Sequence, residues 1–208
     1  MKTHGPPVTI SIPPGQRTEP YRLFWRWYQK AEASGLTYPN GMTLATVTAD
    51  GQPSARIVLL KQVQPDGFVF FTNYRSRKGR ELAENPNAAL VFWWPELKRQ
   101  IRICGSVTKV PAEISDAYFQ TRPRGYKVGA WASEQSRAMD DRFSLAKRFM
   151  QFRSKFGRGE VPRPPHWGGY RLEPVEFEFW EERVNRLHER RYFTPDKGGT
   201  WRMKRLFP

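Results

Sequence analysis

Four short stretches of the sequence combine cationic and aromatic side chains at spacings that could bind an anion. The first is Arg186-Leu187-His188-Glu189-Arg190. If this segment is extended, Arg186, His188 and Arg190 share one face of a strand. Two guanidiniums beside an imidazole would bind a phosphate or an electron-rich ring, although a solvated strand could carry the same residues.

The second and third stretches lie earlier in the chain. Ser76-Arg77-Lys78 begins a predicted short helix, where cations are unfavourable because the helix dipole is positive there. Ser76 as an N-cap followed by two cations suits an external anion, with ordinary surface charge as the alternative. From Arg56 to Lys61, four apolar residues separate two cations, and one continuous strand would place these on opposite faces.

The fourth stretch holds Tyr118 and Arg122, which lie four positions apart and so share one helix face. Helix C-termini favour arginine in any case, so this pair alone is weak evidence. The sequence has no Gly-rich dinucleotide fingerprint, no nucleotide phosphate loop and no serine-hydrolase elbow. With Cys104 as the single cysteine and three scattered histidines, we expect no metal site.

Charge and hydropathy limit the partners. The 208 residues include 35 Lys and Arg against 20 Asp and Glu, a formal charge of +15. This excess predicts anionic partners such as phosphorylated small molecules, nucleic acid or acidic lipid. The longest apolar run, 88–94, is too short to span a membrane, and no apolar leader follows Met1. We expect a soluble, cytoplasmic protein with no membrane association.

Hydrophobic periodicity predicts the elements that must position these residues. Residues 1–17 are rich in proline and glycine and predict a flexible N-terminal arm, followed by a single domain over 18–208. Strands are expected over 42–48, 54–63, 68–73, 88–94, 99–110, 175–179, 190–194 and 200–206, and helices over 18–35, 76–85, 111–122 and 140–156, with a loop over 163–169. Because helices do not alternate regularly with strands, this favours a β-rich α+β fold, an antiparallel barrel with helices packed outside.

Together these stretches resemble the pyridoxamine 5'-phosphate oxidase family, from about residue 20 to the C-terminus. The motifs occur in the family's order and spacing: Arg56 to Lys61, Phe71-Thr72-Asn73, Ser76-Arg77-Lys78, Arg99-Gln100, Tyr118 to Pro123, Gly129-Ala130-Trp131, Ser133 to Ser136, Trp167-Gly168-Gly169, Glu178-Phe179-Trp180, Arg186 to Arg190 and Arg205 to Pro208. The resemblance implies an antiparallel FMN-binding split β-barrel and a homodimer with two FMN sites at the subunit interface. It also implies oxidation of pyridoxamine or pyridoxine 5'-phosphate to pyridoxal 5'-phosphate, with O2 as acceptor and H2O2 released.

The resemblance further implies residue roles. FMN would contact Arg56, Ile57, Val58, Leu59, Leu60, Lys61, Phe71, Thr72, Ser76, Arg77, Lys78, Gln100, Gln135, Ser136, Trp180 and Arg190. The substrate phosphate would contact Lys61, Tyr118, Arg122 and Tyr126. Arg186 and His188 would lie over the pyridine ring as the catalytic pair, orienting and polarising the substrate without either being an obligatory base.

The sequence departs from the family pattern at two places, and two alternative functions remain open. Tyr126 occupies the place of a small serine, and the arm lacks the Arg-rich segment that some members fold over the site. A flavin oxidase of the same fold could act on another compound, such as a phenazine precursor. A basic, aromatic-rich barrel could instead bind nucleic acid, but only 67–70 faintly resembles an RNA-recognition strand. Lys61, Tyr118 and Arg122 favour the vitamin substrate and no nucleic-acid partner.

Overall fold

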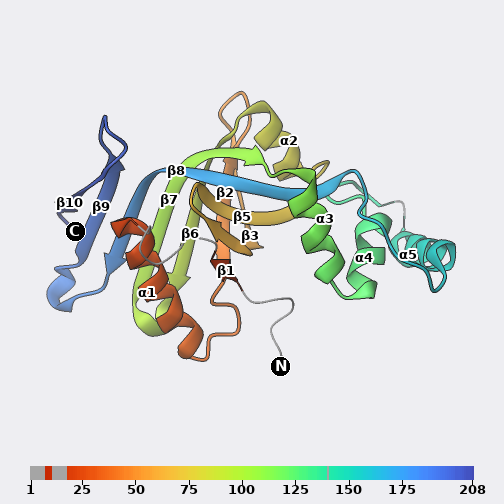
Figure 1. Cartoon of the computed structure of the whole chain (residues 1–208), viewed down its shortest axis with the longest axis horizontal. Coiled ribbons are helices and arrows are strands. Elements are labelled where there is room, and N and C mark those ends of the chain that lie inside the picture. The colour runs from red at the N-terminus through yellow and green to blue at the C-terminus, as the bar shows by residue number, and fades with distance from the viewer. Residues whose placement is uncertain (1–7, 11–17, 140) are drawn as a thin grey trace.

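The computed structural model describes residues 8–10, 18–139 and 141–208, and in these residues ten strands form one curled sheet (Figure 1). The strands are β1 Thr9–Ile10, β2 Gly41–Val47, β3 Pro53–Leu59, β4 Gln62–Gln64, β5 Gly67–Asn73, β6 Asn87–Trp94, β7 Arg99–Lys109, β8 Trp167–Glu181, β9 Glu189–Pro195 and β10 Trp201–Leu206. The helices are α1 Glu19–Ala33, α2 Arg77–Glu84, α3 Ala112–Thr121, α4 Arg124–Ala132 and α5 Ser144–Phe156, with 3-10 turns η2 Pro95–Leu97 and η3 Val184–Arg186.

The sheet order is β1-β4-β5-β8-β7-β6-β2-β3, and β9 and β10 extend it from β8. In the described chain, every strand pair is antiparallel except the short parallel pair β1–β4. The predicted antiparallel, β-rich architecture is therefore confirmed. None of the described helices combines the length and the hydrophobicity needed to cross a bilayer.

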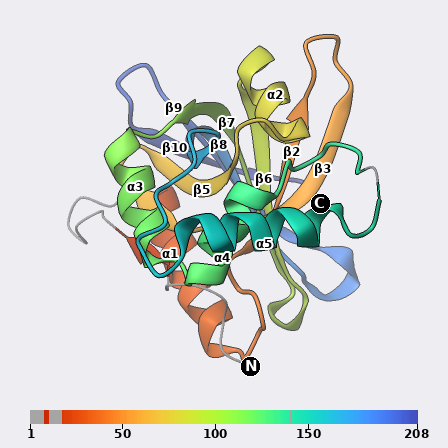
Figure 2. The ribbon, with the colours of Figure 1, turned by 90° about the vertical axis from the view of Figure 1, so that its right-hand side faces the viewer.

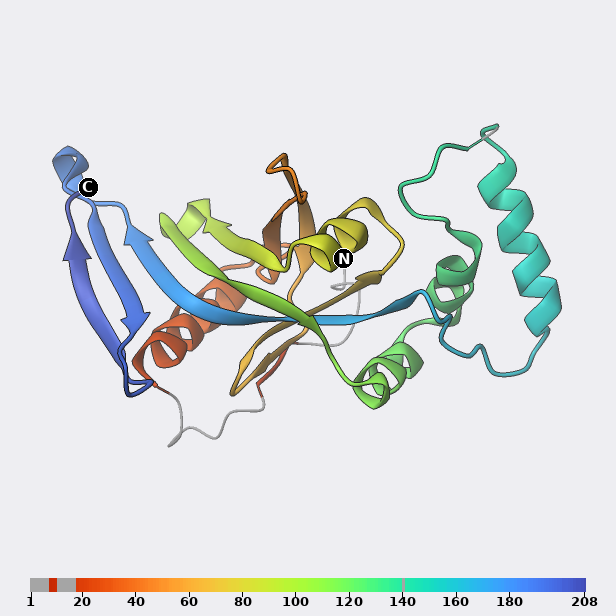
Figure 3. The same cartoon turned by 90° about the horizontal axis from the view of Figure 1, so that it is seen from above.

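The long strand β8 joins two parts of the sheet. Its first residues pair with β5, from Trp167 to Leu172, and its last residues pair with β9, from Phe177 to Glu181. Strand β7 lies along its other edge. Figures 1 and 3 show the consequence: the β9–β10 hairpin lies at one end of the molecule, and α4 and α5 lie at the other.

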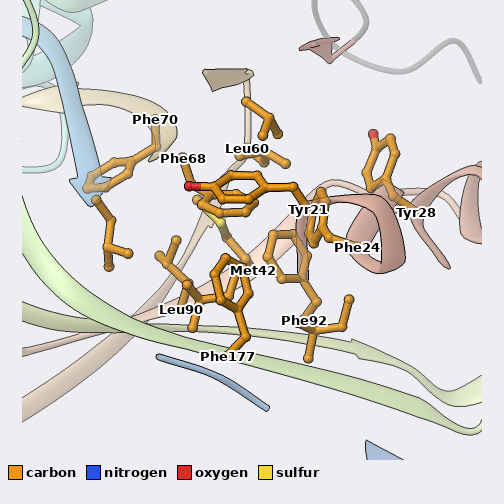
Figure 4. Close-up of a cluster of buried hydrophobic side chains, with 14 of the residues drawn as sticks. Tyr21, Phe24, Tyr28, Met42, Leu60, Phe68, Phe70, Leu90, Phe92 and Phe177 are labelled. Carbon is orange, nitrogen blue, oxygen red and sulfur yellow. The ribbon is translucent and has the colours of Figure 1, made fainter. Parts of the chain in front are cut away.

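The main core forms between α1 and the sheet. Helix α1 turns a stripe of apolar residues inward, and Phe24 and Ala31 have no exposed surface at all. Phe24 meets Phe68 of β5 and Phe92 of β6 edge-on, with ring centroids 4.9 and 5.3 Å apart. Figure 4 shows these rings converging on Met42 and Phe177. Burial of such aromatic side chains fixes the barrel strands that carry the site residues.

A second, smaller cluster joins α3, α4 and α5 to the start of β8. Its buried members are Phe119, Val128, Val161 and Trp167, and partly buried rings from α5 pack against it. Figure 2 shows α5 lying across α4 at this end of the molecule. The Arg122 guanidinium, just after α3, lies over the Phe119 and Trp167 rings of this cluster.

Several predicted element boundaries were wrong. Residues 54–63 form two strands, because the chain leaves β3 after Leu59 and begins β4 at Gln62. The predicted loop over 163–169 ends early, since β8 begins at Trp167. Helix α4 was not predicted at all, and α5 begins at Ser144 rather than near residue 140.

The N-terminal arm also differs in part from its prediction. The proline-rich sequence of 1–17 predicts a flexible arm without regular structure, yet Thr9 and Ile10 form β1. The Thr9 N–H donates to the Lys61 carbonyl at 3.0 Å, and Val8 packs against the main core. The remainder of the predicted flexible arm, 1–7 and 11–17, lies outside the described residues.

Candidate active site

A cavity of about 390 Å³ opens where β3, β5, α2 and α3 meet. Its lining residues are Ile57, Val58, Leu59, Lys61, Phe71, Thr72, Lys78, Tyr118, Arg122, Pro123, Tyr126, Gln135 and Trp167. Eleven of the residues expected at the site from the sequence therefore line this one cavity. They are Ile57, Val58, Leu59, Lys61, Phe71, Thr72, Lys78, Tyr118, Arg122, Tyr126 and Gln135. Three of them are cationic, and none of the described lining residues is acidic.

One wall of the cavity is a stack of aromatic rings. Phe71 and Tyr118 stack with centroids 4.0 Å apart and planes at 11°, and Trp167 lies parallel to both. Gly169 makes this stack feasible, because a Cβ there would lie 2.8 Å from the Phe71 ring. Burial raises the pKa of Tyr118 to about 12, against a smaller lowering effect of Arg122. The Tyr118 hydroxyl is therefore a neutral hydrogen-bond donor at physiological pH.

Lys61 enters the cavity from the connection between β3 and β4. Its N–H donates to the Val69 carbonyl at 2.9 Å, so the backbone is held by β5. The prediction that Arg56 and Lys61 lie on opposite faces of one strand was wrong, because that strand ends at Leu59. Lys61 is only 8% exposed, and burial, followed by the charge of Arg122, lowers the pKa of its ammonium. A buried cation in this state favours an anionic ligand.

Arg122 follows the last turn of α3, and its side chain lies on the aromatic wall. The guanidinium carbon is 4.7 Å from the centre of the Trp167 ring, a cation–π contact. Its Nη1 atom is buried and has no hydrogen-bond partner among the described residues. Burial lowers the pKa of this group too. An unpartnered buried donor of a cation is a costly feature, and a bound anion would satisfy it.

Lys78 contributes the third cation of the cavity, from the N-terminus of α2. Ser76 caps this helix as predicted, accepting from the Gly79 N–H and donating to the Asn73 carbonyl at 2.7 Å. Lys78 is 7% exposed, and its Nζ lies 3.3 Å from both the Thr72 and the Ser76 hydroxyls. Burial, with a contribution from Arg56, lowers its pKa. The helix N-terminus and this ammonium together form an anion-binding environment.

Arg56 and Arg77 were expected to contact FMN, but neither lines the cavity. Both contact the buried carboxylate of Glu81, Arg56 through Nη2 at 3.1 Å and Arg77 through Nε at 2.8 Å. The sequence analysis missed Glu81, although its spacing of four from Arg77 is typical of a helical ion pair. Of the three cations Arg56, Arg77 and Lys78, it is Lys78 that lines the cavity.

Gln135 and Ser136 follow α4. Gln135 lines the main cavity, whereas Ser136 lines a neighbouring cavity of about 340 Å³ formed by 132–139 and the start of α5. Ser136 has a positive φ of 71°, a conformation that L-residues rarely adopt without a tertiary constraint. Tyr126 is 45% exposed and lines the main cavity beside Arg122.

Five of the expected site residues lie at the other end of the molecule, near the β9–β10 hairpin (Figures 1 and 3): Gln100, Trp180, Arg186, His188 and Arg190. Trp180 of β8 pairs with Gln100 of β7 on one edge and with Arg190 of β9 on the other. Trp167 and Trp180 are thirteen positions apart on β8, about 40 Å along the strand at the usual rise per residue. One chain therefore does not bring these five residues to its own cavity.

The local geometry around Arg186 also differs from its prediction. Arg186 does not share a strand face with His188 and Arg190, because it lies in η3 with a φ of 60°, and β9 begins at Glu189. The His188 ring lies 4.6 Å from the Trp180 ring, and its Nδ1 accepts a hydrogen bond from the Arg183 N–H. In the neutral imidazole this places the proton on Nε2, which is then a donor.

Arg190 is held by two groups that the sequence analysis did not identify. Its Nε donates to Glu178 at 2.8 Å, and its Nη1 donates to the Phe207 carbonyl at 2.9 Å. Glu178 is 5% exposed and also pairs with Arg102. The motif Glu178-Phe179-Trp180 thus supplies an anchor for Arg190 as well as the ring of Trp180. In the described part of the chain, no cluster of His, Cys, Asp or Glu is placed to hold a metal ion.

The curled antiparallel sheet places the chain among proteins with the FMN-binding split-barrel fold, and a solved structure shares this fold. A pyridoxamine 5'-phosphate oxidase-related, FMN-binding protein of Nostoc punctiforme has the same fold, with a TM-score of 0.74 at 18% identity over 92% of this chain and all of that one. Residues 29–156 match the family model described as pyridoxamine 5'-phosphate oxidase, and residues 167–208 match the C-terminal dimerisation region of pyridoxine 5'-phosphate oxidase. The chain belongs to the pyridoxamine 5'-phosphate oxidase family.

Curated relatives match over almost the whole chain. A pyridoxine/pyridoxamine 5'-phosphate oxidase of Nostoc punctiforme is 56% identical over 91% of this chain and 88% of its own length. The Cupriavidus necator protein of the same name is 57% identical over 91% and 89%. Among solved structures, PhzG of Burkholderia lata, in complex with tetrahydrophenazine-1-carboxylic acid, has a TM-score of 0.87 at 33% identity, covering 95% of this chain and 98% of that one.

Proposed function

We propose that this protein is an FMN-dependent oxidase that converts pyridoxamine or pyridoxine 5'-phosphate to pyridoxal 5'-phosphate and reduces O2 to H2O2. The observation that carries this conclusion is a cavity lined by three cations, the buried Lys61 and Lys78 and the half-buried Arg122, beside a flat aromatic wall. It occurs in a chain 56% identical to a named oxidase of this kind. The homodimer follows from the dimerisation region at residues 167–208.

The residues present fit FMN. A phosphate dianion would satisfy Lys78 and the N-terminus of α2, where Ser76 and Thr72 offer hydroxyls. We assign Arg56, Arg77, Gln135 and Ser136 to the same phosphate group from the neighbouring segments. The flavin ring would be bounded by Ile57, Val58, Leu59, Lys61, Phe71 and Thr72, with Gln100, Trp180 and Arg190 completing its surroundings. Leu60 was expected there too, but it does not line the cavity, because its side chain is fully buried in the main core. When bound, FMN supplies the two-electron chemistry that links substrate oxidation to O2.

The substrate's own phosphate would be bound by Lys61 and Arg122. Their ammonium and guanidinium groups supply charge-assisted hydrogen bonds, and the neutral Tyr118 hydroxyl adds a third donor. Tyr126 lines the same cavity and offers a further hydroxyl where family members have serine. The protein's contribution here is to position the substrate, since the cofactor carries the redox step.

We assign Arg186 and His188 to the substrate ring, as residues supplied by the second copy of the chain. Each chain carries a cavity at one end and Gln100, Trp180, Arg186, His188 and Arg190 at the other. A two-fold dimer brings the end of each chain to the cavity of its partner, so both sites are completed at once. His188 would donate from Nε2, and Arg186 would hold a charge near the reacting carbon. We place the enzyme in the cytoplasm, where a protein with Cys104 alone needs no disulfide.

The purified protein provides the test. We expect a yellow protein that releases FMN rather than FAD after acid treatment, and aldehyde formation from pyridoxine 5'-phosphate with consumption of O2. Because PhzG shares the fold and binds tetrahydrophenazine-1-carboxylic acid, that compound is the matched comparison substrate. Turnover of the phenazine compound but not of the vitamin phosphate would assign the alternative function. A protein that takes up no FMN would contradict both.

A further inference from the structure

Glu81 is a buried carboxylate beside the proposed flavin phosphate site. It lies in the second turn of α2 and is only 3% exposed. Charged side chains are rarely buried to this extent unless they are paired and hydrogen-bonded. Glu81 does not line the cavity, so it has no direct contact to offer a ligand there.

Four side chains hold this carboxylate. Thr46 donates at 2.5 Å and Ser54 at 2.7 Å, from the paired strands β2 and β3. Arg56 and Arg77 donate from β3 and from the first turn of α2. Burial alone would raise the pKa of Glu81, but these hydrogen bonds outweigh it and lower the pKa to about 2. The group is therefore a permanent anion at physiological pH.

Glu81 orders the two arginines in different ways. The Arg56 guanidinium is tied to its own chain through Nη1, which donates to the Leu44 carbonyl and to Thr46, and through Nη2, which donates to Ser54 and Glu81. Arg77 uses only Nε on Glu81. Both terminal amino groups of Arg77 remain without a partner among the described residues, and its side chain is 60% exposed.

We propose that Glu81 is a positioning residue for the cofactor phosphate, an inference that rests on the proposed function. It holds the Arg56 guanidinium against β2 and β3 and holds Arg77 through Nε alone, so that the terminal amino groups of Arg77 are free for the phosphate. An arginine ordered in advance loses less rotamer freedom when it binds. Glu81 also stabilises the protonated form of the buried Lys78.

The negative charge of Glu81 has an opposing effect, because it repels a phosphate. Glu81 interacts with the guanidiniums of Arg56 and Arg77 and with the ammonium of Lys78, so these four groups together carry a net charge of +2. The phosphate therefore still meets a positive environment. We expect the ordering of the arginines to outweigh the repulsion, since orienting groups of this kind commonly change ligand affinity by about ten- to a hundredfold in metal sites.

The test compares two flavins that differ only in the phosphate. The full-length protein is stripped of flavin, and FMN and riboflavin are titrated separately while flavin fluorescence is followed. For Glu81→Gln we expect the Kd of FMN to rise about tenfold or more, with the Kd of riboflavin unchanged. Glu84→Gln, an exposed acid on the same helix, is the matched control and should leave both values at those of the parent.

A second variant covers the case in which Glu81→Gln does not fold. Glu81→Asp keeps the charge but is one methylene too short to contact both arginines, so we expect a smaller loss that is again confined to FMN. Parental FMN affinity in these variants, equal losses for FMN and riboflavin, or tighter FMN binding would each overturn the inference. Failure of the parent itself to bind FMN would instead contradict the proposed function, on which the inference depends.

Discussion

Lys61 and Arg122 line the same cavity although they come from distant parts of the chain. Burial lowers the pKa of Lys61, and the positive charge of Arg122 lowers it further. The buried Lys61 ammonium and the half-buried Arg122 guanidinium repel each other, and the buried Nη1 of Arg122 has no partner among the described residues, so together they form a receptor for a dianion. A bound phosphate relieves the repulsion and satisfies the free donor, which explains why this arrangement persists in an otherwise aromatic pocket.

The lowered pKa of Lys61 predicts how substrate affinity depends on pH. The protonated form, present below its pKa, binds the phosphate, so affinity is lost as pH rises through that pKa. Because the pKa is lowered, the loss begins at a lower pH than for an ordinary lysine, whose pKa is about 10.4. We expect KM for pyridoxine 5'-phosphate to rise on the alkaline side in the parent.

Lys61→Arg is the control for this pH dependence. Arginine keeps its charge to about pH 12, so the alkaline rise in KM should move to higher pH or disappear. The assay is run with saturating FMN, because Lys78 also has a lowered pKa. Identical alkaline profiles for the parent and Lys61→Arg would show that Lys61 does not bind the substrate phosphate.

Substitutions at Arg122 and Tyr126 should separate charge from a neutral hydroxyl. Hydrogen bonds to charged groups contribute more than neutral ones, so Arg122→Ala should lower kcat/KM for pyridoxine 5'-phosphate about ten- to a hundredfold. Tyr126→Ser and Tyr126→Phe remove or replace one neutral donor and should change it by less than about tenfold. Equal effects of Arg122→Ala and Tyr126→Phe, or equal activity on unphosphorylated pyridoxine, would contradict this assignment.

Alanine substitutions at Arg186 and Arg190 should have different effects on flavin retention and turnover, although the two residues are close in sequence. Arg190 is fixed by Glu178 and the Phe207 carbonyl beside Trp180, a position suited to the flavin. Arg190→Ala should therefore weaken FMN retention, measured by flavin release on dilution. Arg186→Ala, in the η3 turn, should keep its flavin and lose turnover. Flavin loss with normal turnover after resupply in Arg186→Ala would reverse the two roles.

Glu81 predicts a component of acid stability. Its pKa of about 2 lies below the ordinary 4.5, so its ionised form stabilises the fold above about pH 4.5, and this contribution is lost as pH falls toward 2. Glu81→Gln should lower the free energy of unfolding by about 3 kcal/mol at pH 7, because it breaks a buried ion pair. Urea unfolding of the flavin-free proteins should show this difference shrinking between pH 4.5 and 3. A difference independent of pH would argue against an ionised Glu81.

Local patterns in the sequence were sufficient for most elements of the barrel. Hydrophobic patterning predicted β2, β5, β6 and β7 to within two residues, with alternation over β2 and a continuous apolar run over β6, and Ser76 was identified as the cap of α2. Helix α4 was not predicted, because Pro123 and Gly125 at its start have low helix propensity. Packing of Val128 in the second cluster stabilises this helix. Tertiary contacts therefore overrode a weak local preference there.

The site was less predictable than the fold, because its geometry depends on contacts between distant segments. The spacing of Arg186, His188 and Arg190 indicates one strand face, but positive φ angles at Asn185 and Arg186 form a turn instead. Pairing of Arg56 with a buried acid from α2 likewise has no signal in the sequence around Arg56. The division of the site between the two ends of the chain required the structure as well as the family resemblance.

In the proposed dimer, each active site combines the cavity of one chain with Arg186 and His188 of the other. Hybrid dimers, made by co-expressing two differently tagged chains and purifying on both tags, test it directly. One hybrid pairs an Arg122→Ala chain with an Arg186→Ala chain. Its reciprocal pairs an unmodified chain with a chain that carries both substitutions.

In a shared site, the first hybrid has one site with both lesions and one intact site, so it should show about half the parental activity per dimer. The reciprocal hybrid has one lesion in each site and should be almost inactive. If each site were built from a single chain, the outcomes would exchange: the first hybrid would be almost inactive, and the reciprocal would retain about half. Measuring kcat per dimer for the two hybrids therefore decides between these arrangements, and activity in the reciprocal hybrid alone would contradict the shared site.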